Sequence, residues 1–178
     1  MQEPTHILAG VIFQRALLRK WSRKIMFVPM AILAFLSHGI LDKLANVTYH
    51  PRRADFHSVV WDSYHLTVLV FTILFLCFWW RSFKWGILFA MLPDLDWVFI
   101  HGQEIFGLRL SWYQQPHLHH FLGWILANIP GLAWLDHLPN NREHWWGALF
   151  ELLLVIGMLA LIRFMTSKHE SEPTVKPV

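Results

Sequence analysis

Residues 25–45 read IMFVPMAILAFLSHGILDKLA, an apolar run with polar side chains in its last third. About 20 apolar residues are enough for a helix to cross the hydrocarbon core of a bilayer, so this run predicts a membrane helix. His38 and Asp42 lie inside it, although a charge at the centre of such a helix costs at least about 2.5–3.5 kcal/mol. Imidazole and carboxylate groups are also common metal ligands. The run therefore predicts a membrane fold and indicates a metal site within it.

The rest of the chain repeats this pattern of apolar blocks, at residues 5–18, 64–80, 83–101, 121–135 and 145–164. The block 121–135 is interrupted by Pro130 and Gly131, and it predicts either a crossing or a re-entrant segment. With 55% hydrophobic residues and a mean hydropathy of +0.37, the chain is more apolar than an ordinary soluble domain. We expect an all-α, polytopic membrane helix bundle of four to six helices at residues 1–165, followed by a disordered tail at residues 166–178.

Charge and cysteine content narrow the class of protein further. The net charge of +3 is modest, and the basic residues cluster beside apolar blocks, which favours membrane orientation over nucleic-acid binding. Cys77 has no second cysteine with which to form a disulfide or a thiolate metal site. The eleven tryptophans, many of them at block edges, are typical of a belt at the lipid headgroups. We therefore expect a lipid bilayer, and no nucleic acid, as partner.

Basic side chains predict which ends of the blocks face the cytoplasm. They cluster in two connections, with Arg15, Arg19, Lys20, Arg23 and Lys24 in the first and Arg81 and Lys84 in the second. The positive-inside rule places both connections in the cytoplasm. Threading the chain from there brings nine of the twelve histidines to the opposite side, together with Asp42, Asp94 and Asp96. If residues 121–135 are re-entrant, the loop 136–144 joins that side and the C-terminus is cytoplasmic; if they cross, the loop is cytoplasmic.

Two short motifs offer paired metal ligands. His38 and Asp42 are four residues apart, so they share one face of a helix. Asp94 and Asp96 follow Pro93, and a proline can unwind the local turn so that both carboxylates reach one site. Paired carboxylates hold a divalent ion, or one holds the ion while the other acts as a base. The alternatives are a His–Asp hydrogen bond between buried groups and a solvated helix end at Asp96.

A histidine cluster and an arginine pair complete the candidate residues. In an extended segment, alternation would place His117 and His119 on one face, with His120 pointing elsewhere. Such a tract is also typical of adventitious metal binding or of a pH-responsive surface. Arg52 and Arg53 lie on the predicted non-cytoplasmic side, against the trend of the other basic residues. They would bind a phosphate or carboxylate of a substrate, or contact lipid headgroups.

Four motifs of the chain together resemble those of the bacterial inner-membrane metal-dependent hydrolase family, which is distantly related to zinc-dependent phospholipase C. They are Thr5-His6-Ile-Leu-Ala-Gly10, Ser37-His38-Gly-Ile-Leu-Asp42, Leu92-Pro-Asp-Leu-Asp96 and His117-Leu-His-His120, in an order permuted relative to the family. The resemblance implies that metal is held by His6, His38, Asp42, Asp94 and Asp96. His117, His119 and His120 would stand for the remaining histidines of the family.

The expected function is metal-dependent hydrolysis of a phosphoester in a lipid or other amphiphile, at a bacterial inner membrane. One or two divalent ions, zinc favoured over manganese or iron, would activate water. The expected metal ligands are His6, His38, Asp42, Asp94 and His117, the expected catalytic residues are Asp96, His119 and His120, and the expected substrate-binding residues are Arg52 and Arg53. A metal- or proton-coupled transporter that uses the same residues is the main alternative. A haem-binding membrane subunit with histidine axial ligands is another.

Overall fold

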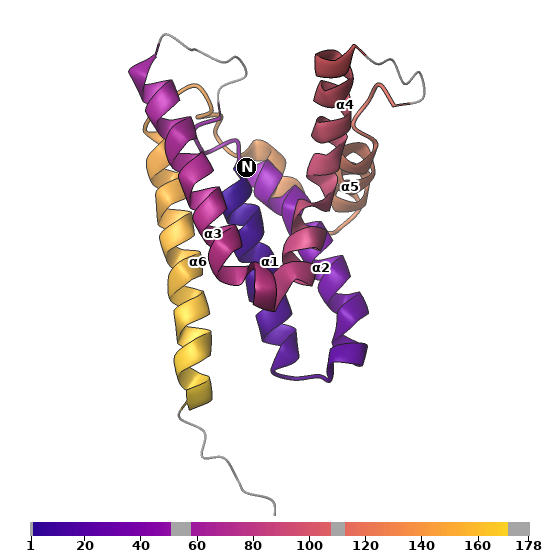
Figure 1. Ribbon diagram of the computed structural model, residues 1–178. Coiled ribbons are helices and arrows are strands. Elements are labelled where there is room, and N and C mark those ends of the chain that lie inside the picture. The colour runs from indigo at the N-terminus through magenta and orange to yellow at the C-terminus, as the bar shows by residue number, and fades with distance from the viewer. Residues whose placement is uncertain (1, 51–57, 108–112, 171–178) are drawn as a thin grey trace, which may run out of the picture.

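The computed structural model describes residues 2–50, 58–107 and 113–170, and these residues form helices and connections without a β-strand (Figure 1). The helices are α1 (Glu3–Leu18), α2 (Arg23–Leu44), α3 (Val59–Met91), α4 (Leu95–Phe106), α5 (His117–Ala127) and α6 (Gly147–Glu170), with the 3-10 turns η1 (Leu92–Asp94) and η2 (Ala133–His137). The predicted all-α bundle of four to six helices is therefore confirmed for the described part of the chain.

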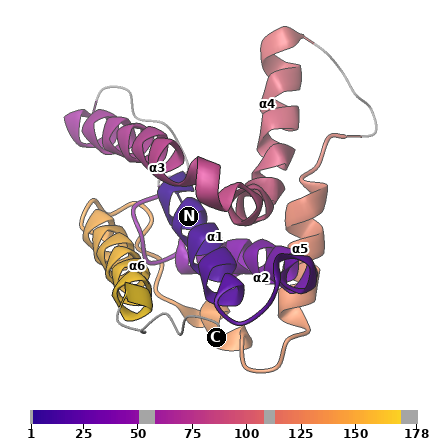
Figure 2. The same ribbon diagram turned by 60° about the horizontal axis from the view of Figure 1, so that its bottom comes forward.

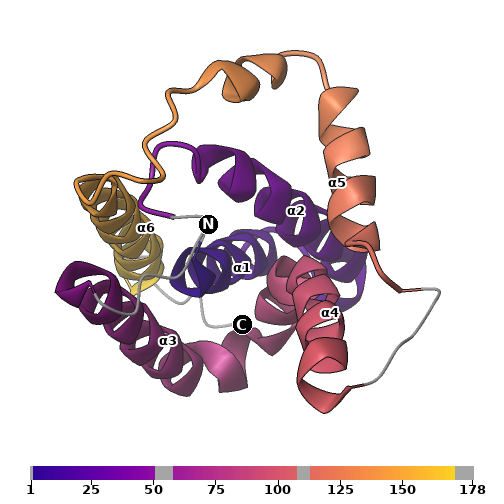
Figure 3. The same cartoon turned by 90° about the horizontal axis from the view of Figure 1, so that it is seen from above.

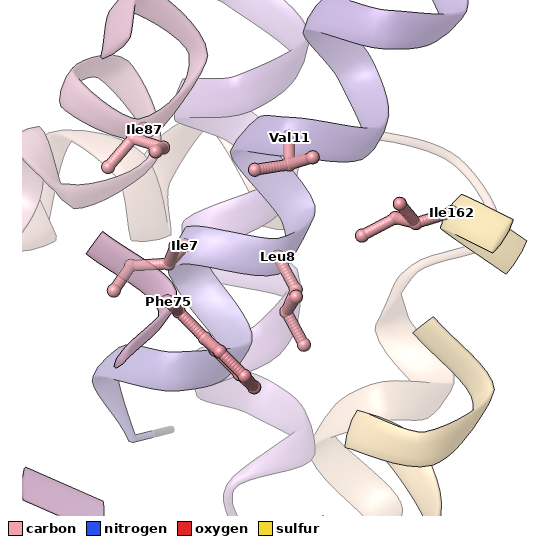
Figure 4. Packing of buried hydrophobic residues seen from close by; sticks show 6 residues of the cluster. All are labelled: Ile7, Leu8, Val11, Phe75, Ile87 and Ile162. Atoms are coloured by element: carbon pink, nitrogen blue, oxygen red, sulfur yellow. The ribbon is translucent and has the colours of Figure 1, made fainter. Parts of the chain in front are cut away.

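Helix α1 lies at the centre of the bundle, where it contacts α2, α3 and α6 (Figures 2 and 3). Its apolar side chains meet those of α3 and α6 in the main hydrophobic core. The buried members of this core are Ile7, Leu8 and Val11 of α1, Phe75 and Ile87 of α3, and Ile162 of α6 (Figure 4). Burial of side chains of this size is the main favourable contribution to folding. The core thus fixes the short helix that carries His6.

Three helical segments are long and apolar enough to cross a membrane: Arg23–Leu44, Val59–Gln103 and Gly147–Ser167. Large apolar side chains cover the outer faces of these segments. Ile25 is 65% exposed, Phe78 76% and Leu153 64%. Continuous apolar surface of this kind is unfavourable in water and favourable against lipid chains. These helices are therefore suited to a bilayer by their length, by their composition and by the outward direction of their apolar side chains.

Helix α3 bends at Phe83, whose φ of −129° and ψ of 23° depart from helical values. The sequence predicted separate helices at residues 64–80 and 83–101, but α3 continues across the bend to Met91 and α4 follows after η1 (Figure 1). Gln14 of α1 lies against the bend. Its Oε1 accepts a hydrogen bond from Gly86 N at 2.7 Å, and its Nε2 donates to the Ser82 carbonyl at 3.2 Å. These are the two groups that a regular helix would join directly, so the Gln14 amide bridges them beside the bend.

Two glycines allow α1 and α3 to approach closely beside this bend. A Cβ atom on Gly10 would lie 2.4 Å from the carbonyl oxygen of Gly86, and one on Gly86 would lie 2.2 Å from the carbonyl oxygen of Gly10. Any side chain at either position would therefore force the helices apart. Small residues at such contacts are a common means of close helix packing in membranes. The contact fixes α1 relative to the second half of α3.

The C-terminal third of the chain decides between the two threadings that the sequence allowed. Backbone hydrogen bonds from Asn141 N to Asn46 O and from His50 N to Arg142 O attach the loop 138–146 to the end of α2. At the opposite end of the bundle, Arg19 donates to the Met165 carbonyl of α6 at 3.4 Å. The described residues thus follow the re-entrant alternative, with the loop 136–144 at the histidine-rich end. The tail predicted from residue 166 is wrong for residues 166–170, because α6 continues to Glu170; residues 171–178 lie outside the described part.

Glu151 of α6 anchors the beginning of α1. This carboxylate is only 6% exposed. Its Oε2 accepts a hydrogen bond from the Tyr64 hydroxyl at 2.5 Å, and its Oε1 accepts one from the backbone N–H of Gln2 at 3.2 Å. A buried carboxylate is stable only when its oxygens are satisfied in this way. The three residues join α6, α3 and the start of α1, four residues before His6.

Candidate metal centre

His38 and Asp42 form the base of a cluster at one end of the bundle. Both project from the last turns of α2, and His38 Nε2 lies 3.2 Å from Asp42 Oδ2. The His38 ring is fully buried, and its Nδ1 lies 2.8 Å from the carbonyl oxygen of Ala90 on α3. A carbonyl oxygen only accepts hydrogen bonds, so Nδ1 carries the proton and Nε2 of the neutral ring presents a lone pair. This is the arrangement in which histidines bind metal ions.

His6 enters the cluster from the first turn of α1. Its ring stacks on the His38 ring, with centroids 3.9 Å apart and an angle of 15° between the planes. Its Nε2 lies 3.5 Å from Asp42 Oδ1, yet neither of its buried ring nitrogens makes a hydrogen bond within the described residues. Burial lowers the pKa of His6 to about 3, which keeps its imidazole neutral. A buried, neutral imidazole without hydrogen bonds is a rare arrangement that calls for an explanation, and ligation of an ion provides one.

Asp94 reaches the cluster from the 3-10 turn η1, which interrupts the helical path after Pro93 as the sequence suggested. Its Oδ1 lies 3.6 Å from His38 Nε2. Its other oxygen, Oδ2, is buried and has no hydrogen-bond partner among the described residues. A buried carboxylate oxygen without a hydrogen-bond partner is costly, and a bound cation would offset that cost. Asp94 therefore adds acceptor capacity to a site already rich in acceptors.

His119, in the first turn of α5, closes the cluster opposite His38. Its Nε2 lies 3.4 Å from His38 Nε2 and 3.5 Å from Asp42 Oδ2. Its Nδ1 lies 2.9 Å from Asp96 Oδ2, so Nδ1 donates to the carboxylate and Nε2 is the acceptor. The Trp97 indole N–H, 3.3 Å from Nε2, agrees with this tautomer. The Nε2 atoms of His38 and His119 thus lie 3.4 Å apart beside Asp42, close enough for one cation to contact both nitrogens.

The electrostatics of the cluster favour a bound cation. Burial lowers the pKa of His119, but the neighbouring carboxylates of Asp42 and Asp96 outweigh this effect and raise the pKa above its ordinary value. The carboxylates that favour a proton on His119 would equally favour a metal ion in its place. Two sets of donor atoms lie within 4.8 Å of one another, namely His6, His38 and Asp42, and His38, Asp94 and His119. Three imidazoles with two carboxylates make a donor set that suits zinc, manganese or iron.

Asp96 lies behind His119 and holds its ring in place. The Asp96 side chain has no exposed surface. Its Oδ2 accepts from the His119 ring and from the His119 backbone N–H at 2.8 Å, while its Oδ1 accepts from the Tyr113 hydroxyl. Burial and the neighbouring carboxylate raise the pKa of Tyr113 to about 12, so the hydroxyl stays protonated. A carboxylate that orients a ligating histidine in this way is a common partner in metal sites.

The cluster opens into a cleft of about 600 Å³. Its polar wall includes Glu3, Asp42, Asp94, His119 and Arg142, and its apolar wall includes Met91, Trp97 and Val98. The cleft therefore combines a candidate metal centre, a guanidinium group and an apolar surface in one volume. Such a cleft has room for a substrate beside the ion.

The structure brings some of the predicted site residues together and leaves others apart. His6, His38, Asp42, Asp94 and His119 meet, and Asp96 lies directly behind them. His117 and His120 are exposed and lie outside both sets of candidate ligands. The predicted alternation is wrong because α5 begins at His117, and in a helix His117 and His119 point to nearly opposite sides. Arg52 and Arg53 lie outside the described residues.

Sequence reasoning missed three partners of this site. The Ala90 carbonyl is a backbone group, so the residue type at position 90 does not predict its contact with His38. Tyr113 precedes α5 in an irregular segment, where no periodicity relates it to Asp96. Arg142 lies in the loop 136–144, whose location depended on the unresolved threading of residues 121–135. The re-entrant threading alone would have placed Arg142 at the histidine-rich end.

Comparison with protein families, curated proteins and solved structures finds no match for this chain. The class of site is consequently defined by its own geometry and donor set. That class is a candidate divalent-metal centre, built from imidazoles and carboxylates at one end of a helical bundle that is suited to a membrane.

Proposed function

We propose that this chain is a membrane-bound metal-dependent hydrolase that cleaves a phosphoester in a lipid or other amphiphile. The observation that carries the proposal is the pair of Nε2 atoms on His38 and His119, 3.4 Å apart and flanked by Asp42 and Asp94. The resemblance of its four motifs to the bacterial inner-membrane hydrolases supports the same class of reaction and a bacterial inner membrane as its location.

The proposed metal ligands are His6, His38, Asp42, Asp94 and His119. Zinc is favoured because three of the five donors are imidazole nitrogens, with manganese or iron as alternatives. A single ion would be bound through the Nε2 atoms and the two carboxylates. Asp42 also suits a two-ion site, because its Oδ1 faces His6 while its Oδ2 faces His38 and His119.

The proposed location is the non-cytoplasmic end of the bundle. The site lies at the start of α1 and the end of α2, whereas the basic connection between these helices lies at their other ends. The positive-inside rule assigns that basic connection to the cytoplasm. A substrate would therefore reach the cleft from the opposite leaflet.

The proposed reaction is attack by water on the phosphorus of the ester. The divalent ion would supply Lewis acidity, which makes water more acidic and offsets the charge on the phosphate oxygens. In this proposal Asp94 accepts a proton from the water as the water oxygen bonds to phosphorus. The phosphorus–oxygen bond to the alcohol then breaks, and the alcohol oxygen leaves with the bonding electrons and takes up the proton held by Asp94. The chain thereby consumes one water and releases a phosphate product and an alcohol.

Two residues take other parts in this proposal than the sequence alone suggested. Asp96 is a positioning residue for His119, because both of its oxygens are already engaged by protein donors. Arg142 lines the same cleft as Asp94 and His119. Guanidinium groups pair with phosphate oxygens in a planar, two-bond geometry. Arg142 therefore takes the substrate-binding role that the sequence gave to Arg52 and Arg53.

The first test is elemental analysis of the protein purified in detergent, beside the variants His38→Ala and Asp94→Ala. His120→Ala is the matched control, since this exposed histidine on α5 lies outside the cluster. We expect one or two equivalents of zinc, manganese or iron in the native protein and in His120→Ala. We expect their loss from both cluster variants, with unfolding temperatures showing that these variants still fold.

Activity is then measured with bis(p-nitrophenyl) phosphate in the presence and in the absence of added zinc. Metal-dependent release of p-nitrophenol that is lost in Asp94→Ala would support hydrolysis. Absence of bound metal after reconstitution would overturn the proposal. Bound metal without hydrolysis, combined with zinc flux into liposomes, would also overturn it and would favour a transporter.

A further inference from the structure

An apolar groove of about 480 Å³ adjoins the cleft of the metal centre. Its walls come from both halves of α3, from η1 and from the start of α4. Met91, Asp94 and Val98 line the groove and the cleft alike. The two volumes therefore meet at Asp94, a candidate metal ligand.

The bend of α3 creates this groove. Trp80 precedes the bend at Phe83, while Trp85 and Leu88 follow it. The side chains of these three residues all line the groove. A straight helix would carry these side chains along one axis and could not fold them around a common volume. The 3-10 turn then redirects the chain, so that Leu95 of α4 supplies a further wall.

The groove differs from the cleft in chemistry. Apart from Asp94 at the junction, its lining side chains are aliphatic or aromatic. The cleft next to it carries Glu3, Asp42, His119 and Arg142. A molecule that filled both volumes would need a polar, phosphate-bearing end and a hydrocarbon end joined close to the phosphate.

We propose that the groove binds the hydrocarbon chain of the substrate while its phosphoester lies at the metal centre. This inference rests on the proposed hydrolase function and deepens it by assigning the substrate class, a long-chain phosphate ester. Val98 and Met91 guide the chain from the cleft into the groove, and Leu88 and Trp80 surround its further methylenes. The site then selects substrates by chain length, since each methylene buried in an apolar pocket adds a discrimination of roughly three- to fourfold.

The test compares p-nitrophenyl methyl phosphate with p-nitrophenyl octyl phosphate on metal-loaded protein in lipid nanodiscs. Leu88→Trp fills the groove, whereas the control Leu69→Trp places the same ring on the outer face of the same helix, where Leu69 is 54% exposed. We expect the ratio of kcat/KM for the octyl ester to that for the methyl ester to fall about tenfold or more in Leu88→Trp. The ratio stays at the native value in Leu69→Trp, which corrects for partition of the longer ester into lipid.

A second measurement does not depend on turnover. A long-chain alkyl phosphate with a diazirine at the end of its chain is photolysed with the native protein and with both variants. We expect labelled peptides from α3 and α4 in the native protein and in Leu69→Trp, and loss of this labelling in Leu88→Trp. An unchanged octyl-to-methyl ratio in Leu88→Trp, or labelling that the variant retains, would overturn the inference. Hydrolysis of the methyl ester and bound metal test the proposed function separately, so the two failures are distinguishable.

Discussion

Gln14 of α1 accepts a hydrogen bond from Gly86 N at 2.7 Å, just after the bend of α3 at Phe83. One polar side chain on the central helix thereby stabilises an irregular backbone on its neighbour. The bend in turn leads α3 into η1, which carries Asp94. The Gln14 contact therefore belongs to the framework of the metal centre, although it lies far from it in the sequence.

We predict that Gln14→Leu lowers the free energy of unfolding by about 1–3 kcal/mol, the usual cost of a buried donor left without its acceptor. Gln14 is only 5% exposed, so water cannot replace the lost amide. Denaturant or thermal unfolding in detergent measures the effect. Gln115→Leu, at an exposed position, should leave stability nearly unchanged. Equal stability of the two variants would show that the bend does not need the Gln14 amide.

The close contact of α1 and α3 gives a second prediction. Gly10→Ala places a methyl group about where a Cβ would lie, 2.4 Å from the Gly86 carbonyl oxygen, so the helices must separate. Overpacking of this kind typically costs about 1–3 kcal/mol. The control is Gly157→Ala on α6, where a Cβ meets nothing within 4 Å. That variant should be neutral or stabilised by up to about 1 kcal/mol, because alanine favours a helix more than glycine. Unfolding temperatures of both variants decide the matter.

The hydrogen bond between Asp96 and His119 predicts the behaviour of the metal. Asp96→Asn should weaken metal binding about 10- to 100-fold, the usual effect of removing a carboxylate that orients a ligating histidine. Competition with a chelator measures the change. Asp136→Asn alters an exposed carboxylate that pairs with Lys43, and it should leave the affinity unchanged. Native metal affinity with lost turnover in Asp96→Asn would instead assign Asp96 the role of general base.

His50 predicts the pH dependence of stability. Burial, assisted by the positive charge of Arg142, lowers the pKa of His50 from its ordinary 6.5 to about 4. Between these values the unfolded chain binds a proton at His50 that the folded protein does not, so stability falls as the pH decreases from about 6.5 to 4. His50→Gln should show a shallower loss than the native protein over this window. Parallel stability curves for the two proteins would contradict the prediction.

The sequence predicted the architecture well wherever hydropathy determines it. The apolar runs at residues 25–45 and 145–164 became α2 and α6 with shifts of a few residues. The predicted loop at residues 81–84 is wrong. Arg81 and Lys84 suggested it, whereas the backbone is helical on both sides of Phe83. Gln14 bonds to backbone groups on both sides of Phe83, and a contact between residues so distant in sequence leaves no trace in local composition.

The cluster was foreseeable because a rule about lysine and arginine, which uses no histidine, placed the ends of the helices on common sides. His6, His38, Asp42 and Asp94 accordingly meet as expected. The choice among His117, His119 and His120 depended on whether that stretch is extended or helical. Pro116 is compatible with an extended or a helical segment after it. In the helix that forms, His119 points inward and contacts Asp96.

The five proposed ligands enter the chain in the order His6, His38, Asp42, Asp94 and His119, and the last of them comes from the short helix α5. During synthesis, α1, α2 and α3 are complete before His119 and its partner Asp96 can meet. A nascent chain therefore has no closed coordination shell until its long apolar helices have been made. The proposed metal ion would accordingly be acquired late, after those helices have been made.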